Sequence, residues 1–499
     1  MTVGRALGSF LIQAVLVGGT AVLTVLAWCE VASAAPERLN VLLITADDLH
    51  GDATGATGCP LPDITPNIDR LAAEGMRFER AHVTTSLCQP SRTTMMTGRY
   101  CHRTGTLGFK PIRDDVPTLG ESLRADGYFQ AILGKVNHLT PEERFCWDVK
   151  VDAAALRGGR DPDLYYRHVL AALRQSRAAR RPFFVMANTH DPHRPFPALT
   201  NTAMAPKQER IPLVGLDRMY APQEVHVPDF LPDIPVVREE IAQYYTLVRR
   251  CDKTVGAILK ALDDAGYRGS TLVMFLSDNA MPFPFAKGNC YPYSTRTPWI
   301  VRWPGTVTPN RVEREHFIST IDFTPTVLEA IGLPQIAGMD GHSFLPLLQG
   351  KSQNGRDCVF TTYDQFSDKV TGPIRSVTNG RYTYIFNAWF GRAEPFCSGM
   401  TEGRSFPAMQ DAAKHDPAVA ARVDMYLRRV QDELYDVEQD PCALHNVVGD
   451  PARAEVLREL RKRLLDMMTS TADPWLEKYQ AFLRTTSKIP PSSRFPKLK

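Results

Sequence analysis

The sequence predicts an α/β protein with a large, mixed but mostly parallel sheet flanked by helices, and a smaller C-terminal α+β domain. Continuous apolar runs at 40–46, 182–188 and 271–276 are typical of strands buried on both faces. Segments with helical start and stop signals lie between these runs. The chain has 499 residues, which is enough to bury one large core and a second, smaller one.

The composition is that of an ordinary globular protein. Hydrophobic residues make up 43% of the chain and charged residues 23%, and the net charge is +3. The chain has no polybasic run, so we expect no nucleic-acid partner. A mildly basic balance is compatible with a polyanionic sugar as substrate, but it is too weak to establish one.

Residues 1–34 are predicted to be a secretory signal peptide that does not belong to the fold. Arg5 precedes an apolar stretch at about 7–28, and Ala-Ser-Ala at 32–34 is a small-residue cleavage site. A retained membrane anchor is the alternative, since the stretch approaches the length of a span. The glycines at 18–19 and the cleavage site favour removal. We therefore expect an exported protein with no stable membrane span after processing.

The cysteines and glycosylation signals bear on the compartment. Of ten cysteines, eight remain when Cys29 and Cys88 are set aside, and the sequence does not decide how they pair. The chain contains no Asn-x-Ser/Thr acceptor for N-glycosylation. This absence favours a periplasmic or secreted bacterial protein over a lysosomal glycoprotein.

The pattern of elements predicts the domain organisation. A main domain is expected at 36–352, a smaller C-terminal domain at 353–486 and a loose tail at 487–499. Helices are expected at 65–75, 118–126, 237–265 and 452–469. The Pro-rich segment 205–235 shows no clear period, so we expect a long loop that shapes a binding pocket.

The segment 86–98 carries the most specific pattern in the chain. It reads Ser-Leu-Cys-Gln-Pro-Ser-Arg and continues to a Thr-Gly pair at its end. Pro90 suits the first turn of a helix, so Cys88 is expected at a helix N-terminus with Arg92 projecting back toward it. A helix N-terminus beside an arginine suits an anion. A buried cysteine beside a helix cap is the ordinary alternative for a lone cysteine.

Acidic and amide side chains follow two of the predicted strands. Asp47 and Asp48 end the first apolar run, and Asp278 and Asn279 follow the run at 271–276. In open α/β sheets, ligands bind at the carboxyl ends of the strands. Adjacent buried acids are costly unless a positive charge lies between them. Four oxygen-bearing side chains suit a hard divalent cation such as calcium or magnesium.

The Cys-x-Pro-Ser-Arg pattern with its following Thr-Gly resembles the signature of the type I sulfatase family. The resemblance implies an alkaline-phosphatase-like sulfatase fold in which the main domain is catalytic. It also implies that a formylglycine-generating enzyme oxidises Cys88 to formylglycine, whose hydrate is the nucleophile. The implied metal ligands are Asp47, Asp48, the matured residue 88, Asp278 and Asn279, with calcium as the ion and magnesium as an alternative.

Four basic residues match further positions of the family pattern. Lys135 and His138 correspond to its Gly-Lys-x-His motif, although two residues separate them here. By resemblance, both of these and Lys287 hold the sulfate group and its developing charge, together with Arg92. His190 is implied to protonate the leaving group. Ala280 stands where the family usually has glycine, which affects the loop rather than the ligands.

Two neighbouring residues are candidates for substrate contact. His193 and Arg194 follow His190 in the sequence His-Asp-Pro-His-Arg. A salt-bridged loop is an equal interpretation for both of them.

Several segments resemble the heparan N-sulfatases (sulfamidases) within this family. They lie at 190–194, 227–303, 374–377, 433–436 and 473–475. The predicted substrate is therefore the N-sulfate of glucosamine in heparan sulfate or heparin fragments. Two departures leave the choice open, since sulfamidases often carry Arg where this chain has Lys287 and use the shorter Lys-x-His spacing. An O-sulfatase acting on glucosamine or another glycan, and a non-catalytic protein that binds sulfated glycans, are the alternatives. A homodimer is also left open.

Overall fold

The computed structural model describes residues 15–17, 20–22, 38–197, 212–401 and 403–486. The chain divides into two units, Met1–Glu37 and Arg38–Lys499. In the first unit, β1 (Val15–Val17) pairs antiparallel with β2 (Thr20–Val22). Most of the predicted signal peptide, and the tail predicted at 487–499, lie outside the described residues. Within the described ranges, no helix has the length and apolar character needed to cross a membrane.

The second unit is built on an eight-stranded sheet with the order β11-β4-β10-β9-β3-β8-β6-β7. The five strands from β9 to β7 are parallel, whereas β10 runs antiparallel to both of its neighbours. The strands are β3 (Asn40–Asp47), β4 (Met76–Phe78), β6 (Phe129–Leu133), β7 (Val149–Val151), β8 (Phe183–Pro192), β9 (Thr271–Ser277), β10 (Trp299–Arg302) and β11 (Arg311–Glu313). Two short strands, β5 (Ala81–His82) and β12 (Ile318–Ser319), form a separate parallel pair.

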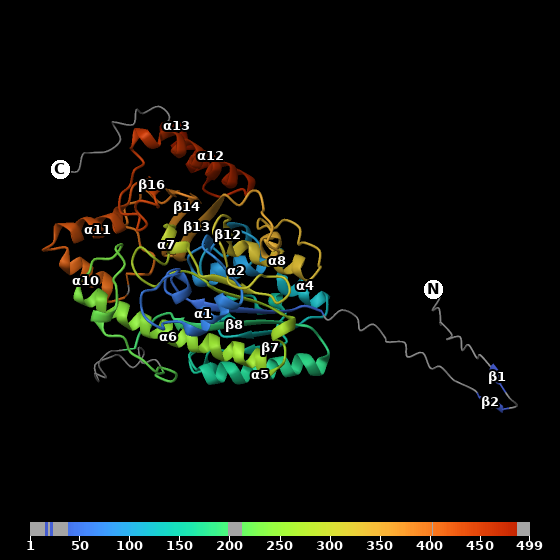
Figure 1. Ribbon diagram of the computed structural model, residues 1–499. Helices are drawn as coiled ribbons and strands as arrows, with labels where there is room; N and C mark the ends of the chain where they lie inside the picture. The colour runs from blue at the N-terminus through green and yellow to red at the C-terminus, as the bar shows by residue number, and fades with distance from the viewer. Residues whose placement is uncertain (1–14, 18–19, 23–37, 198–211, 402, 487–499) are drawn as a thin grey trace. The chain divides into compact units, whose positions relative to one another are not determined.

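The central strands are apolar throughout because they face a core on each side. In β3, Leu42 and Ile44 pack in one core, and Val41 and Leu43 pack in the other. Helices α5 and α6 cover the first face together with α1, whereas α2, α4 and α8 cover the second (Figure 1). These helices are α1 (Pro66–Glu74), α2 (Cys88–Thr97), α4 (Leu119–Ala125), α5 (Pro162–Ala179), α6 (Pro235–Asp264) and α8 (Phe323–Ala330). Shorter helices are α3 (Cys101–Thr104), α7 (Pro292–Thr295) and α9 (Leu345–Leu348).

The C-terminal part forms a smaller antiparallel sheet with the order β13-β14-β15-β16. Its strands are β13 (Cys358–Ser367), β14 (Val370–Asn379), β15 (Tyr382–Asn387) and β16 (Asp432–Asp436). Helices α12 (Ala454–Ser470) and α13 (Leu476–Thr486) pack on it through a third core, while α10 (Ser405–Ala412) and α11 (Pro417–Arg428) lie before β16 (Figure 1). The predicted fold class is thereby confirmed. The boundary at 352/353 stays a prediction, because the second unit is compact as a whole.

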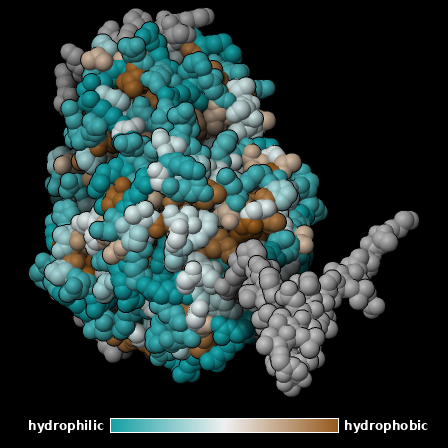
Figure 2. Space-filling view, turned by 45° about the vertical axis from the view of Figure 1, so that its right-hand side comes forward, coloured by the Kyte–Doolittle hydropathy of each residue, from teal (hydrophilic) through white to brown (hydrophobic). Residues whose placement is uncertain are grey.

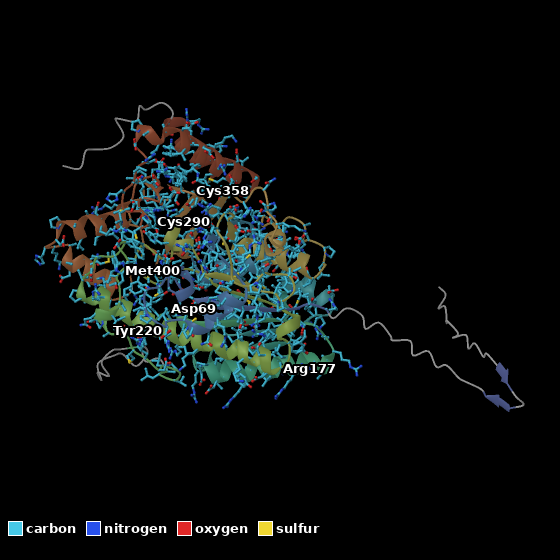
Figure 3. All side chains as sticks on the ribbon, viewed as in Figure 1. Asp69, Arg177, Tyr220, Cys290, Cys358 and Met400 are labelled. Atoms are coloured by element: carbon cyan, nitrogen blue, oxygen red, sulfur yellow. The ribbon has the colours of Figure 1, made fainter. Side chains whose placement is uncertain are left out.

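The surface seen in Figure 2 is polar, and the cysteines of the described residues are unpaired. The face shown in Figure 2 is mostly hydrophilic, with hydrophobic side chains in scattered groups. All nine cysteines of the described residues are free, Cys290 and Cys358 among them (Figure 3). The structure therefore offers no disulfide among these residues.

Candidate active site

The acidic residues that follow β3 and β9 meet at the carboxyl edge of the sheet. Because the two strands are parallel and adjacent, with Ala46 opposite Ser277, their ends come side by side. The Asp278 amide donates to the Ala46 carbonyl at 3.2 Å, and the Asp48 amide donates to Asp278 Oδ1, also at 3.2 Å. Asp48 has a left-handed backbone with φ 69°. Tyr244 of α6 donates from its hydroxyl to the Asp48 carbonyl at 3.2 Å and so supports this turn.

Cys88 is the first residue of α2 and lies against this acidic edge. The preceding Leu87 is extended, so the helix begins at the cysteine as the sequence predicts. The thiol is buried. Its Sγ lies 3.5 Å from Asp47 Oδ1 and 3.6 Å from Asn279 Nδ2. Lys287 Nζ lies 3.0 Å from Sγ and 2.5 Å from Asp48 Oδ1.

Arg92 lies one turn further along α2 and is fully buried. Its Nη2 lies 2.7 Å from Asp278 Oδ2, and its Nη1 donates to Thr45 Oγ1 and Asn188 Oδ1 at 2.6 Å each. The sequence analysis did not identify Thr45 or Asn188 as part of the site. Both stand near the carboxyl ends of the strands that carry the acids and His190, and this position was the available signal.

Lys135 and His138 follow β6, two strands away from β3. Lys135 has a left-handed backbone and its Nζ forms an ion pair with Asp47 Oδ2. A short 3-10 helix, Val136–His138, then places the half-buried His138 beside it. Burial and then the positive charge of Lys135 hold the pKa of His138 well below its ordinary value. This imidazole is therefore neutral near pH 7.

His190 and His193 occupy the end of β8. The His190 amide donates to the Gly159 carbonyl at 3.0 Å, and a Cβ on Gly159 would overlap the His190 ring. Burial and then Lys135 hold the pKa of His190 well below its ordinary value. His193 Nε2 lies 3.8 Å from Asp48 Oδ2. The structure thus places both histidines at the same edge as the acids.

A second group of charged side chains contacts the segment at the end of β8 that carries His190 and His193. Asp191 accepts from Arg250 Nε at 2.6 Å and from Arg250 Nη2 at 3.0 Å, and it also pairs with Arg160. Arg160 Nη2 donates in addition to the His193 carbonyl at 2.8 Å. All three side chains are buried. We call Asp191, Arg160 and Arg250 the Asp191 clamp, because they fix the backbone that carries the two histidines.

Arg194 is held in a salt-bridged loop. Its guanidinium pairs with both carboxylate oxygens of Glu240, and its Nε donates to the Pro282 carbonyl at 3.1 Å. Glu240 also accepts from the Ser405 amide at 2.7 Å and hydroxyl at 2.6 Å. This arrangement supports the salt-bridge interpretation of Arg194. Its contact with substrate stays a prediction.

The acids and bases at this edge form one buried group, which we call the active-site cluster. Its members are Asp47, Asp48, Asp278, Arg92, Lys135 and Lys287. Burial raises the pKa of Asp48 to about 6 and that of Asp278 to about 7. Against the effect of burial, Lys135 lowers the pKa of Asp47 well below its ordinary value. Three carboxylates thus face three cations.

The cluster offers the donor atoms that the predicted divalent metal needs. Among the described residues, Asp48 Oδ2 and Asn279 Oδ1 are buried and have no hydrogen-bond partner. Ligand atoms of Asp47, Asp48, Cys88 and His193 also lie within 4.8 Å of one another. Orphaned carboxylate and amide oxygens are the donors that a hard cation prefers. The residues present therefore fit calcium or magnesium.

The comparisons with known proteins agree with this fold and geometry. Residues 39–333 match the family model described as Sulfatase. Because the match covers more than half of the chain, the chain belongs to the sulfatase family, and it is an enzyme that hydrolyses sulfate esters or sulfamates. Residues 284–390 also match the model described as N-sulphoglucosamine sulphohydrolase, C-terminal.

Individual relatives cover most of the chain. Human N-sulphoglucosamine sulphohydrolase is 29% identical over 475 aligned positions, and the match covers 88% of this chain and 91% of the relative. The Delta 4,5-hexuronate-2-O-sulfatase of Bacteroides thetaiotaomicron is 24% identical over 500 aligned positions, and the match covers 90% of this chain and 93% of the relative. A solved 2-O GAG sulfatase gives a TM-score of 0.65 at 22% identity, covering 88% of this chain and 94% of that one. The predicted family and fold are confirmed.

Proposed function

We propose that this protein removes the N-sulfate of glucosamine in heparan sulfate or heparin fragments. The observation that carries the proposal is the burial of Cys88 among three carboxylates and three cations at the edge of the sheet. The similarity to N-sulphoglucosamine sulphohydrolase, both over the whole chain and in its C-terminal model, supports the N-sulfated sugar as substrate.

The chemistry of Cys88 supports its conversion to formylglycine. Burial and then Asp47 raise the pKa of the Cys88 thiol, so it is protonated and a poor nucleophile at neutral pH. Formylglycine hydrate would supply a hydroxyl that attacks sulfur and a second hydroxyl that allows sulfate to leave by C–O cleavage. A formylglycine-generating enzyme in the host is therefore a required partner.

The charge balance of the active-site cluster supports a sulfate group as ligand. Three carboxylates and three cations leave the cluster without net charge when all are ionised. Asp47, Asp48, Asp278 and Asn279, with residue 88, would hold a divalent cation, most simply calcium. That ion would supply two positive charges and polarise the sulfate oxygens. The surplus matches the two negative charges of the sulfate that departs.

The remaining basic residues have separate proposed tasks. Lys135, Lys287 and Arg92 neutralise charge on the transferred group and hold its oxygens, and the neutral His138 orients a hydroxyl on residue 88. His190 donates a proton to the leaving nitrogen or oxygen. Burial and then Lys135 hold the pKa of His190 well below its ordinary value, and a negative sulfate group bound beside it would raise that pKa. His193 remains a candidate for substrate contact, since it lies at the same edge.

An O-sulfatase acting on glucosamine or another glycan is the second candidate. The relatives include a hexuronate 2-O-sulfatase, and a solved structure with a TM-score of 0.64 contains D-glucosamine-2-N,6-O-disulfate as substrate. A non-catalytic, glycan-binding protein is disfavoured, because every residue of the predicted metal site is present. We also infer that the protein is exported to the periplasm or secreted, on the basis of residues 1–34.

The test is sulfate release from N-sulfoglucosamine and from glucosamine 6-O-sulfate, measured side by side. The enzyme is produced together with a formylglycine-generating enzyme, and mass spectrometry verifies residue 88. Cys88→Ala is the control and should release no sulfate while its circular dichroism stays that of the wild type. Release from the N-sulfated sugar supports the proposal. Release only from the O-sulfated sugar, or equal activity of Cys88→Ala, contradicts it.

A further inference from the structure

An exposed aromatic ring lies beside the candidate active site. Phe109 is 44% exposed, which makes it one of five large hydrophobic side chains that are exposed among the described residues. Its ring lies edge-on to the His138 imidazole, with 5.8 Å between centroids and 72° between planes. His138 is half-buried and follows Lys135 of the active-site cluster by three residues, so Phe109 lies beside the candidate active site.

The loop that carries Phe109 is fixed to the site itself. Gln89, the residue after Cys88, donates from Nε2 to the Lys110 carbonyl at 2.7 Å. The Ile112 amide donates to the Thr140 carbonyl at 2.9 Å, which ties the loop to the segment after His138. The loop is therefore fixed both to α2, which begins at Cys88, and to the segment after His138. A rigid support of this kind is what a binding surface needs.

The C-terminal sheet supplies a second ring behind the first. Phe366 packs edge-on against Phe109, with centroids 5.5 Å apart and planes at 78°. The register between β13 and β14 shifts on both sides of Gln365, and Phe366 is the extra residue of a bulge. Bulges commonly re-aim a side chain beside an active site. Gly399, which precedes Met400 (Figure 3), packs so closely that a Cβ there would lie 2.9 Å from the Phe366 ring.

The loop that carries Phe109 and the end of β13 are also joined by a backbone contact and by an ion pair. A Cβ on Gly108 would lie 3.0 Å from the Gln365 carbonyl oxygen, so this loop is in direct contact with β13. Lys110 and Asp368 form an ion pair at 2.5 Å. The C-terminal domain thus contacts the loop that lies beside His138, although every predicted catalytic residue belongs to the main domain.

We propose that Phe109, supported by Phe366, is the platform on which the sugar ring that carries the sulfate stacks. An exposed, rigid aromatic ring offers the apolar C–H face of a pyranose a surface that excludes water. Phe109 contacts His138 of the candidate active site, so a sugar that stacks on this ring stays close to the residues that hold the sulfate. This inference rests on the proposed function, and it assigns the recognition of the sugar to a pair of rings contributed by both domains.

The test compares Phe109→Ala with Phe109→Tyr in the mature enzyme on N-sulfoglucosamine. Loss of the ring should lower kcat/KM about tenfold, mainly through KM, because a stacked ring contributes on this scale. Phe109→Tyr should restore most of the loss. Inhibition by inorganic sulfate should change less than about twofold in either variant, because the active-site cluster is untouched. Phe390→Ala, which truncates another exposed phenylalanine, should behave as the wild type.

Several outcomes separate the platform from a general defect. Unchanged kcat/KM in Phe109→Ala, or equal losses of sugar turnover and sulfate inhibition, would overturn the proposal. If the wild type hydrolyses only the O-sulfated sugar, the same comparison is made on that substrate. If it hydrolyses neither, calorimetry of N-sulfoglucosamine binding to Cys88→Ala with and without Phe109→Ala decides. About tenfold weaker binding supports the platform, and equal or undetectable binding in both contradicts it.

Discussion

The protein contains two buried groups of charges, the Asp191 clamp and the active-site cluster. They differ in how completely their carboxylate oxygens are hydrogen-bonded. In the Asp191 clamp, both carboxylate oxygens accept hydrogen bonds from arginines. In the active-site cluster, Asp48 Oδ2 has no hydrogen-bond partner among the described residues, and burial raises the pKa of Asp48 and Asp278. A satisfied network belongs to the scaffold, whereas orphaned oxygens indicate a ligand.

The largest expected effect is the loss of activity when the active-site cluster loses one carboxylate. Asp278→Asn should lower kcat/KM about 10³-fold, because a preorganised charge at the reacting group is removed. The free energy of unfolding of the metal-free protein should change by no more than about 1 kcal/mol, since Arg92 keeps an oxygen partner and carboxylate repulsion falls. Kinetics and urea denaturation measure the two. Retained activity would contradict the proposed role of Asp278.

The next effect is on stability and belongs to the clamp. Asp191→Asn should destabilise the protein by about 3 kcal/mol, because two buried arginines lose their counter-charge. Asp233→Asn is the matched control, since Asp233 also pairs with an arginine but is exposed. It should cost less than about 1 kcal/mol. Urea denaturation measures both. Equal stabilities of the two variants would remove the distinction drawn between buried and exposed pairs.

Calcium should stabilise the protein through the active-site cluster alone. At a free concentration of about 100 times its Kd, the ion should add about 2.7 kcal/mol to the free energy of unfolding of chelated wild type. Asp191→Asn should gain the same increment, and Asp278→Asn should gain little. Thermal denaturation with and without calcium tests this. A gain of similar size in Asp278→Asn would place the ion elsewhere.

The smallest effect concerns pH in the metal-free protein. The pKa values of Asp48 and Asp278 are raised to about 6 and about 7, so the folded state binds protons more tightly than the unfolded state. This contribution to stability is complete below about pH 4 and is lost as pH rises through 6 to 7. Asp278→Asn should lose less stability than wild type between pH 5 and 8. Identical pH profiles in the two proteins would contradict the assignment.

The carboxylates of the active-site cluster could be predicted from the residues alone because strand ends determine their place, whereas Lys135 and Lys287 came from the family resemblance. Apolar runs identify β3, β8 and β9, and parallel neighbours must bring their carboxyl ends together. Asp48 and Asp278 could therefore be placed side by side without coordinates. The helix that begins at Cys88 was likewise predicted from Pro90 and the residues after it. The role of each residue stays a prediction, whereas its place at this edge is observed.

The Asp191 clamp and the contact between Phe109 and Phe366 could not be predicted in the same way. Arg160 and Arg250 come from a loop and from α6, and their helical or loop surroundings give no sign that both face Asp191. Phe109 and Phe366 are far apart in the sequence, and they meet where β13 has a bulge. Such pairings depend on tertiary packing, for which local patterns carry no signal.

The measurement that tests the central claim most directly is the binding of inorganic sulfate with and without calcium. Sulfate is titrated calorimetrically into chelated protein and into calcium-loaded protein. The account predicts one sulfate per chain, bound at least about tenfold more tightly when calcium is present, because the neutral cluster then carries two surplus positive charges. Equal binding in the two states, or binding that persists in calcium-treated Asp278→Asn, would contradict a joint site for the metal and the sulfate.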